Sequence, residues 1–183
     1  MRVISGNLRG LKLESLPGME TRPTLDRVKE ALFNILQDKI RQAEVLDLFA
    51  GSGAIGIEAL SRGAKTVTFC DNTRGAIQII QKNIQKARMQ EKATVVIGDY
   101  SKVLKTGKKY DIIFLDPPYQ SNLIIKALQQ MLQQNNVTEN TIIVIETEDE
   151  KKVQEELEKL ELPLEIYDTR KYGRVKLMFM RKG

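Results

Sequence analysis

Residues 45–56 read Val45-Leu-Asp47-Leu-Phe-Ala-Gly51-Ser-Gly53-Ala-Ile-Gly56. The apolar run at 45–49 predicts a buried strand, and residues 54–61 predict a helix. Gly51, Gly53 and Gly56 have the spacing G-x-G-x-x-G, in the strand–loop–helix context that this pattern requires. Missing side chains let a ligand lie against the backbone at the carboxyl end of a parallel sheet. The stretch therefore predicts an α/β fold with a ligand site at this turn.

The alternation of strands and helices continues along the chain. Further predicted strands cover residues 65–70, 94–97, 111–115 and 141–145. Further predicted helices cover residues 74–88, 123–134 and 151–161. This order is typical of βαβ units, and the lack of polar alternation fits strands covered by helices on both faces. We expect a doubly wound, Rossmann-like sheet of seven strands.

The two ends of the chain differ from this middle part. Residues 164–167 and 175–180 predict two strands with a turn at Tyr172-Gly173, an antiparallel hairpin that closes the sheet. Residues 3–4 and 11–13 predict a small hairpin, followed by a helix over 24–36 that Thr24 caps. We expect an N-terminal extension at 1–38 and the main domain at 39–183, working together as one domain.

The rarest residues exclude several classes of chemistry. Histidine is absent from the 183 residues, and cysteine occurs once, at Cys70. This excludes Ser-His-Asp and Cys-His sites, His-ligated metals and thiolate zinc clusters, so we expect no metal. One cysteine forms no internal disulfide, and no apolar stretch suits a signal peptide or a membrane span. We expect a cytoplasmic protein without a membrane partner, a monomer by default, with Cys70 buried.

The net charge of +5 is concentrated at the two ends of the chain. Residues 1–29 carry +3 and residues 165–183 carry +4, which leaves −2 for residues 30–164. Basic ends suit a polyanion whose phosphates they neutralise, although ends that are merely solvated have the same composition. Arg9, Arg170 and Lys171 are the resulting candidates for substrate binding.

Three carboxylates help to choose between NAD and S-adenosylmethionine, which both bind such a glycine loop. Asp71 follows the second strand, where it can accept hydrogen bonds from both ribose hydroxyls. Asp99 follows the third strand, where it can accept one from an adenine amino group. Asp47, inside the first strand, opposes a pyrophosphate and attracts an ammonium and a sulfonium, which favours S-adenosylmethionine. The predicted cofactor-binding residues are Asp47, Gly51, Gly53, Asp71, Asp99 and Tyr100.

Asp116-Pro117-Pro118-Tyr119 directly follows the fourth predicted strand. In a doubly wound sheet this strand runs next to the first, so we expect the loop beside the reactive end of the cofactor. The stiff loop leaves the Asp116 carboxylate and the Pro117 carbonyl to accept both N–H bonds of an exocyclic amine. Tyr119 offers a ring that stacks on a base, and Pro118 is a further candidate substrate contact. The motif predicts methylation of an amino group on a planar base.

Together these motifs resemble the class I S-adenosylmethionine-dependent methyltransferases, and more narrowly the RsmD-like bacterial 16S rRNA guanine-N2 methyltransferases. The stretches that carry the resemblance are Met1-Arg-Val-Ile-Ser-Gly6 with Arg9-Gly10, Arg22-Pro-Thr-Leu-Asp-Arg-Val-Lys-Glu-Ala-Leu-Phe-Asn34, Leu46-Asp-Leu-Phe-Ala-Gly-Ser-Gly-Ala-Ile-Gly56 through Glu58-Ala-Leu-Ser-Arg-Gly63, Asp116-Pro-Pro-Tyr119 and Tyr172-Gly173. The resemblance implies methylation of one guanine amino group in 16S rRNA, in an assembled or assembling 30S subunit. It also implies that Arg22, Thr24 and Arg27 lie near the substrate. Asp71 departs from the family pattern, since many relatives carry Glu there.

Three other functions fit parts of the sequence. A DNA adenine-N6 methyltransferase uses the same loop chemistry, but this chain has little room for a target-recognition region. An NAD-linked oxidoreductase leaves the Asp116–Tyr119 motif unexplained and lacks a proton-relay residue here. A non-catalytic RNA-binding module has no need of an intact methyl-transfer motif. rRNA methylation is therefore the function that the sequence favours.

Overall fold

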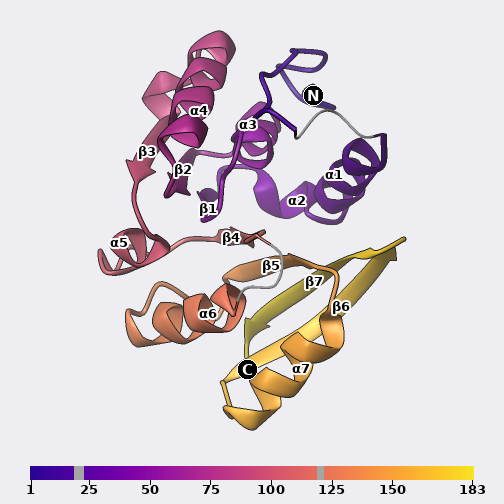
Figure 1. Cartoon of the computed structure of the whole chain (residues 1–183), viewed down its shortest axis with the longest axis vertical. Coiled ribbons are helices and arrows are strands. Elements are labelled where there is room, and N and C mark those ends of the chain that lie inside the picture. The colour runs from indigo at the N-terminus through magenta and orange to yellow at the C-terminus, as the bar shows by residue number, and fades with distance from the viewer. Residues whose placement is uncertain (19–22, 119–121) are drawn as a thin grey trace. The chain divides into compact units, whose positions relative to one another are not determined.

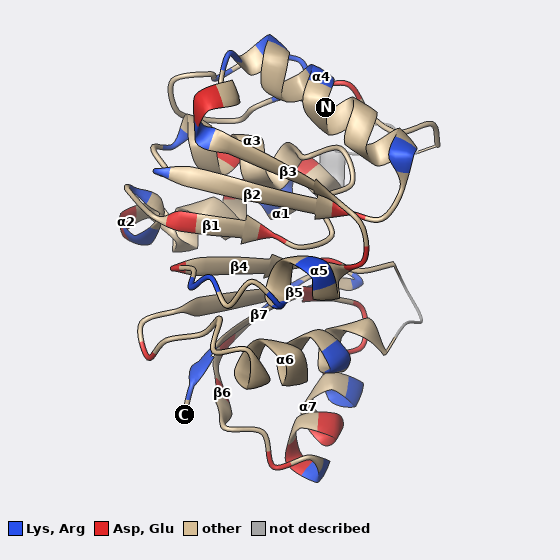
Figure 2. Cartoon of the chain, turned by 90° about the vertical axis from the view of Figure 1, so that its left-hand side faces the viewer, with Lys and Arg blue, Asp and Glu red and all other residues tan. Residues whose placement is uncertain are grey.

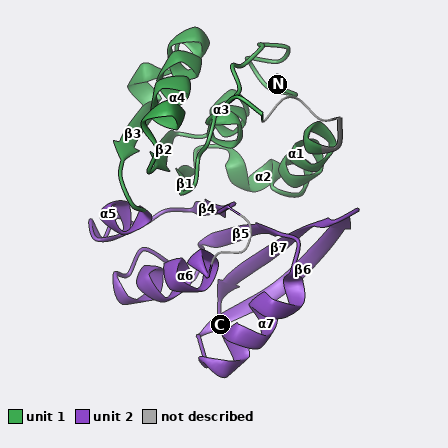
Figure 3. Ribbon diagram, in the orientation of Figure 1, with its two compact units in different colours: residues 1–99 green, residues 100–183 purple. Residues whose placement is uncertain are grey.

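The computed structural model describes residues 1–18, 23–118 and 122–183 of the chain. The chain forms two compact units, Met1–Asp99 and Tyr100–Gly183 (Figure 3). The expected N-terminal extension at 1–38 and main domain at 39–183, working together as one domain, stay a prediction.

Three parallel strands form the sheet of the first unit, in the order β3-β2-β1 (Figure 1). They are β1 (Glu44–Asp47), β2 (Thr66–Asp71) and β3 (Ala93–Ile97). Helix α3 (Ala54–Ser61) packs against β1 and β2, and α4 (Arg74–Ala87) packs against β2 and β3. A 3₁₀ turn, η1 (Gln90–Lys92), leads into β3. Asp47 pairs with Phe69 and Asp71 with Ile97, so the carboxyl ends of all three strands lie at one edge.

The N-terminal part of this unit is a narrow hairpin followed by two helices. Arg2 and Lys12 form an antiparallel bridge, and Val3 N–H donates to the Leu11 carbonyl at 2.9 Å. Helix α1 (Pro23–Ile35) begins one residue before the predicted start. Thr24 therefore lies in the first turn, and the prediction that it caps the helix is wrong. Proline suits this first position because its missing N–H would have no partner there. A short helix, α2 (Gln37–Ile40), follows.

The second unit contains four strands in the order β4-β5-β7-β6. Strands β4 (Ile112–Leu115) and β5 (Ile142–Thr147) are parallel, and β7 (Val175–Lys182) lies antiparallel between β5 and β6 (Leu164–Tyr172). Its helices are α5 (Tyr100–Leu104), α6 (Leu123–Gln133) and α7 (Glu150–Lys159). The predicted α/β class, with seven strands and an antiparallel C-terminal hairpin, is confirmed.

Each unit has an apolar core that its strands share with its helices. Phe33 of α1 and Phe69 of β2 are fully buried in the first unit, as is Cys70, in agreement with its predicted role. All four residues of β4 are buried in the second unit, together with Phe179 of β7. None of the helices in the described part of the chain is long and apolar enough to cross a membrane.

Candidate functional site

The glycine loop follows β1 at the carboxyl edge of the first unit. Gly51 and Gly53 have φ angles of 56° and 79°, in the left-handed region that glycine adopts without strain. Ala50 N–H donates to the Cys70 carbonyl of β2 at 2.9 Å, which holds the loop to the sheet. A Cβ atom built on Gly51 would meet nothing within 4 Å. The backbone at Gly51 is therefore open to a ligand, whereas a Cβ atom on Gly53 would lie 3.3 Å from the side chains of Phe69 and Ile80. The predicted role of both glycines in binding a cofactor stays a prediction.

Gly56 has a different role from the other two glycines. It lies in α3, and a Cβ atom there would come within 2.2 Å of Cε1 of Phe69 and 2.9 Å of Cγ1 of Val67. Both of those side chains belong to β2 and are buried. Gly56 thus lets the helix after the loop pack closely on the sheet, and this packing fixes the direction of the loop.

Asp71, the last residue of β2, organises the loop with both of its carboxylate oxygens. Oδ2 accepts a hydrogen bond from the Gly51 N–H at 3.0 Å. Oδ1 accepts from the N–H and the hydroxyl of Thr73, each at 3.0 Å, and Thr73 in turn caps α4 by accepting from the Ala76 N–H. A carboxylate has about four acceptor positions, so Asp71 retains capacity for a ribose hydroxyl. That role stays a prediction.

Asp47 is a buried carboxylate at the end of β1, with 4% of its surface exposed. Its Oδ2 accepts from the Gly56 N–H at 3.1 Å. Burial raises the pKa of Asp47 to about 7, opposed by the Gly56 hydrogen bond and increased further by the charge of Asp71. A cation beside it would favour the ionised form. Asp47 is therefore suited to a positively charged ligand, which is the property on which its predicted role depends.

Figure 2 shows acidic residues at the carboxyl ends of β1 and β2, and β1 also begins with an acidic residue, Glu44. Gly98 N–H donates to the Asp71 carbonyl at 3.0 Å, which ties the end of β3 to this edge. Asp99 follows Gly98 and is exposed, and Tyr100 is half-buried at the start of α5. Their predicted contacts with the cofactor stay predictions.

The Asp116–Tyr119 motif leaves the carboxyl end of β4 in the second unit. Asp116 and Pro118 are exposed, whereas Pro117 between them is buried. The buried proline anchors the loop, and the fixed φ of the two prolines limits how Asp116 can move. Tyr119 lies outside the described residues, so its predicted stacking role is not tested.

The predicted substrate-binding residues have different surroundings. Arg9 in the N-terminal hairpin and Arg27 on α1 are exposed. Arg170 pairs with Asp168 at 2.9 Å, and Lys171 Nζ lies 2.7 Å from Oε1 of Glu150. Arg22 lies outside the described residues, as does the side chain of Thr24. Phosphates that reach Arg170 or Lys171 must compete with these ion pairs.

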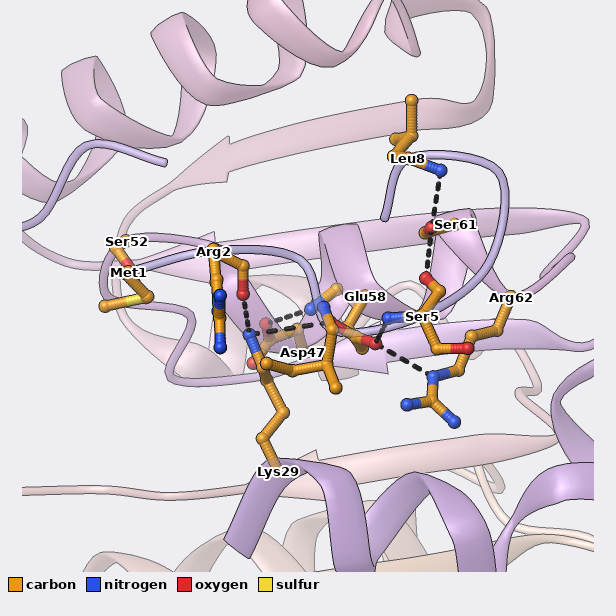
Figure 4. A network of polar contacts seen from close by, with 12 residues as sticks. Met1, Arg2, Ser5, Leu8, Lys29, Asp47, Ser52, Glu58, Ser61 and Arg62 are labelled. Atoms are coloured by element: carbon orange, nitrogen blue, oxygen red, sulfur yellow. Dashed lines mark hydrogen bonds and ion pairs between the residues drawn. The ribbon is translucent and has the colours of Figure 1, made fainter. Parts of the chain in front are cut away.

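Glu58, within α3, is a buried charged residue whose role the sequence reading did not predict (Figure 4). It accepts from the N–H groups of Ile4 and Ser5 at 2.9 and 3.0 Å. It also pairs with Lys29 of α1 at 3.5 Å and with Arg62 at 2.9 Å. Glu58 thus joins the N-terminal hairpin and α1 to the helix after the glycine loop. The sequence does contain a signal for this role, because Glu58 is the one charged residue in the otherwise uncharged run Ala54–Leu60.

Asn83 of α4 makes a second connection of this kind. It is fully buried, and its Nδ2 donates to the Ser52 carbonyl of the glycine loop at 3.0 Å and to the Glu14 carbonyl at 2.9 Å. Its Oδ1 accepts from the Glu14 N–H at 2.8 Å. One side chain therefore holds the loop and the residue after the N-terminal hairpin together.

The described residues contain no group of three or more His, Cys, Asp or Glu side chains that could hold a metal ion. The first unit offers an open backbone at Gly51, with one carboxylate bound to Gly51 and a second, buried carboxylate bound to Gly56. What the second unit offers is an exposed carboxylate on a proline-stiffened loop.

Residues 1–181 match the family model described as conserved hypothetical protein 95. The chain is 41% identical over 155 residues to Ribosomal RNA small subunit methyltransferase D of Haemophilus influenzae, covering 82% of this chain and 80% of that protein. The protein of the same name from Escherichia coli K12 is 35% identical over 148 residues, with 81% and 75% covered. The solved structure of yhhF from Escherichia coli is 33% identical, covers 100% of this chain and 97% of that chain, and superposes with a TM-score of 0.85.

Proposed function

The chain belongs to the conserved hypothetical protein 95 family, the RsmD-like family that its motifs resemble, and from this we propose that it methylates small-subunit rRNA. In full, the proposal is transfer of a methyl group from S-adenosylmethionine to the N2 amino group of one guanine in 16S rRNA. The substrate is an assembled or assembling 30S subunit, and the enzyme acts in the cytoplasm as a monomer without a metal. The names of the relatives support the rRNA part of this proposal.

The observation that carries the proposal is the open Gly51 backbone, held by the carboxylate of Asp71, in a glycine loop whose following helix is held by the carboxylate of Asp47 at Gly56. S-adenosylmethionine supplies a methyl group on a cationic sulfur, and the bond to sulfur breaks with its electron pair left on sulfur. Asp47 balances this positive charge at the end of β1, and Asp71 has acceptor capacity left for the ribose. Gly53, Asp99 and Tyr100 complete the proposed cofactor site.

In the proposed reaction the second unit holds the base. The Asp116 carboxylate and the Pro117 carbonyl accept the two N–H bonds of the guanine amino group, and Tyr119 stacks on the ring. This arrangement directs the N2 lone pair at the methyl carbon, where the new N–C bond forms. The proton that N2 loses passes to Asp116. Arg9, Arg22, Thr24, Arg27, Pro118, Arg170 and Lys171 are the proposed RNA contacts.

Methyl transfer from labelled S-adenosylmethionine tests the proposal directly. The substrates are 16S rRNA and 30S particles from cells that lack this enzyme, and the product is digested and its nucleosides are identified. We expect N2-methylguanosine, and calorimetry should detect binding of S-adenosylmethionine but not of NAD. N6-methyladenine, formed in DNA, would contradict the proposal, as would binding of NAD alone.

The Asp116→Ala variant tests the role of the loop. We expect the methylation rate to fall at least about 100-fold, because the amino group is no longer oriented. Calorimetric binding of S-adenosylmethionine should be unchanged. Glu139→Ala, an exposed carboxylate in the same unit, is the matched control and should keep full activity. Full activity in Asp116→Ala would show that the carboxylate has no such role.

A further inference from the structure

Glu146 lies beside the start of the Asp116 loop, within the second unit. Strands β4 and β5 run parallel, and the last pair in their register joins Leu115 to Ile145. Asp116 and Glu146 are the next residues on the two strands, and neighbouring strands lie about 4.8 Å apart. A second carboxylate therefore stands next to the one that we propose holds the amino group.

The surroundings of Glu146 set it apart from the acidic residues that follow it. Its backbone pairs with Leu177 of β7, and its side chain is only partly exposed. Among the residues that the structure describes, its carboxylate accepts no hydrogen bond and forms no ion pair. Glu148 is exposed, and Glu150 is paired with Lys171. Burial raises the pKa of Glu146, which expresses the cost of keeping a charge at this place.

The edge of a guanine supplies the partner that this carboxylate lacks. Guanine presents its N1–H donor directly beside the two N–H donors of its 2-amino group. Adenine presents an acceptor at N1, as does 2-aminopurine, although 2-aminopurine keeps the 2-amino group. A carboxylate next to Asp116 can accept from N1–H of guanine, whereas it would face a lone pair in the other two bases.

We propose that Glu146 is a specificity-determining residue that accepts a hydrogen bond from N1–H of the target guanine. This deepens the proposed function and rests on it. Asp116 and Pro117 hold the group that is methylated, and Glu146 recognises which purine carries it. No proton is transferred to Glu146 in the reaction.

The test compares guanosine with 2-aminopurine riboside at the methylated position of 16S rRNA, reconstituted into 30S particles. The measured quantity is the ratio of kcat/KM for the two substrates, with labelled S-adenosylmethionine. We expect the wild-type enzyme to prefer guanosine by about 10- to 100-fold. In Glu146→Gln the ratio should fall at least about 10-fold, because an amide N–H can donate to N1 of 2-aminopurine.

Glu148→Gln, two residues further along, is the matched control and should keep the wild-type ratio. Thermal unfolding and calorimetric binding of S-adenosylmethionine show whether Glu146→Gln is intact, and Glu146→Ala gives the same readout if the first variant does not fold. A ratio equal to that of the wild type in the folded variant overturns the proposal, even if activity on both substrates falls. Failure of the wild-type enzyme to methylate guanosine at N2 is a separate result, and it would overturn the proposed function and this inference together.

Discussion

Asp47 shows how one residue can combine a cost in stability with a use in binding. Its carboxylate is buried at the end of β1, and burial raises its pKa to about 7. Such a group is partly protonated at neutral pH when no ligand is present. A cationic ligand requires the ionised form, so binding should depend on pH near neutrality.

We predict that wild-type protein releases a proton when it binds S-adenosylmethionine below about pH 7, and that its affinity falls as the pH decreases further. Calorimetry in two buffers with different ionisation enthalpies measures this release. Asp47→Asn should lose both the release and most of the affinity. An unchanged affinity in Asp47→Asn would place the cationic ligand elsewhere.

Asp47→Asn should also change the stability of the folded protein, in a direction and by an amount that depend on pH. The pKa of Asp47 is higher in the folded state than the ordinary value of 3.8. Its contribution to the free energy of unfolding is therefore most favourable below pH 3.8 and is lost as the pH rises to about 7. Asp47→Asn should therefore raise Tm at pH 8 relative to wild type, and much less at pH 4. The gain has an upper limit of about 4 kcal/mol, since each pKa unit corresponds to about 1.4 kcal/mol.

At the scale of helices and strands, the elements with strong local signals were predicted well. Helix α3 was predicted over 54–61 and is found there, between the left-handed Gly53 and Gly63. Strand β6 was predicted only as far as Tyr167 but continues to Tyr172, because pairing with β7 extends it through polar residues. Helices α2 and α5 were missed, since four or five residues are too few to show a helical period.

The packing of α3 on β2 leads to a prediction for two glycines. Gly56→Ala should destabilise the protein by about 1–3 kcal/mol, because the new methyl group would overlap the buried Phe69 ring. Gly75→Ala, on the exposed first turn of α4 with nothing within 4 Å, should stabilise it by about 0.5–1 kcal/mol. Urea unfolding measures both variants. Equal effects at the two positions would contradict the close approach of α3 to the sheet.

The ion pairs of Glu58 lead to a prediction about how the elements of the first unit are held together. Glu58→Ala removes the acceptor for the Ile4 and Ser5 N–H groups and leaves the buried Lys29 ammonium without its carboxylate. We expect a loss of about 3–5 kcal/mol in the free energy of unfolding. Glu165→Ala, which breaks the exposed pair with Arg181, should cost about 0–1 kcal/mol and serves as the control. A small effect at Glu58 would mean that the hairpin is held by other contacts.

For the molecule as a whole, the uneven charge should control how tightly RNA binds. The affinity for 16S rRNA should fall with salt, and each lost phosphate contact should reduce the slope of log K against log salt by about 0.7–0.9. The double variant Arg9→Ala/Lys12→Ala should therefore reduce the slope by up to roughly 2. Lys126→Ala, on α6 outside the basic ends, is the control.

The double variant Arg170→Ala/Lys171→Ala should have a smaller effect, because these side chains already pair with Asp168 and Glu150. An unchanged slope of log K against log salt in Arg9→Ala/Lys12→Ala would mean that these two basic residues serve solubility only.

The order of the strands and longer helices, the glycine loop and the Asp116 loop all follow from patterns that span a few neighbouring residues, so the sequence alone determined them. The partners of Glu58 did not follow, since Ile4 and Ser5 lie 54 and 53 residues away in the chain. The raised pKa of Asp47 and the place of Glu146 beside Asp116 did not follow from the sequence either. Burial and the pairing of strands depend on the path of the whole chain, and for that reason only the tertiary structure decided them.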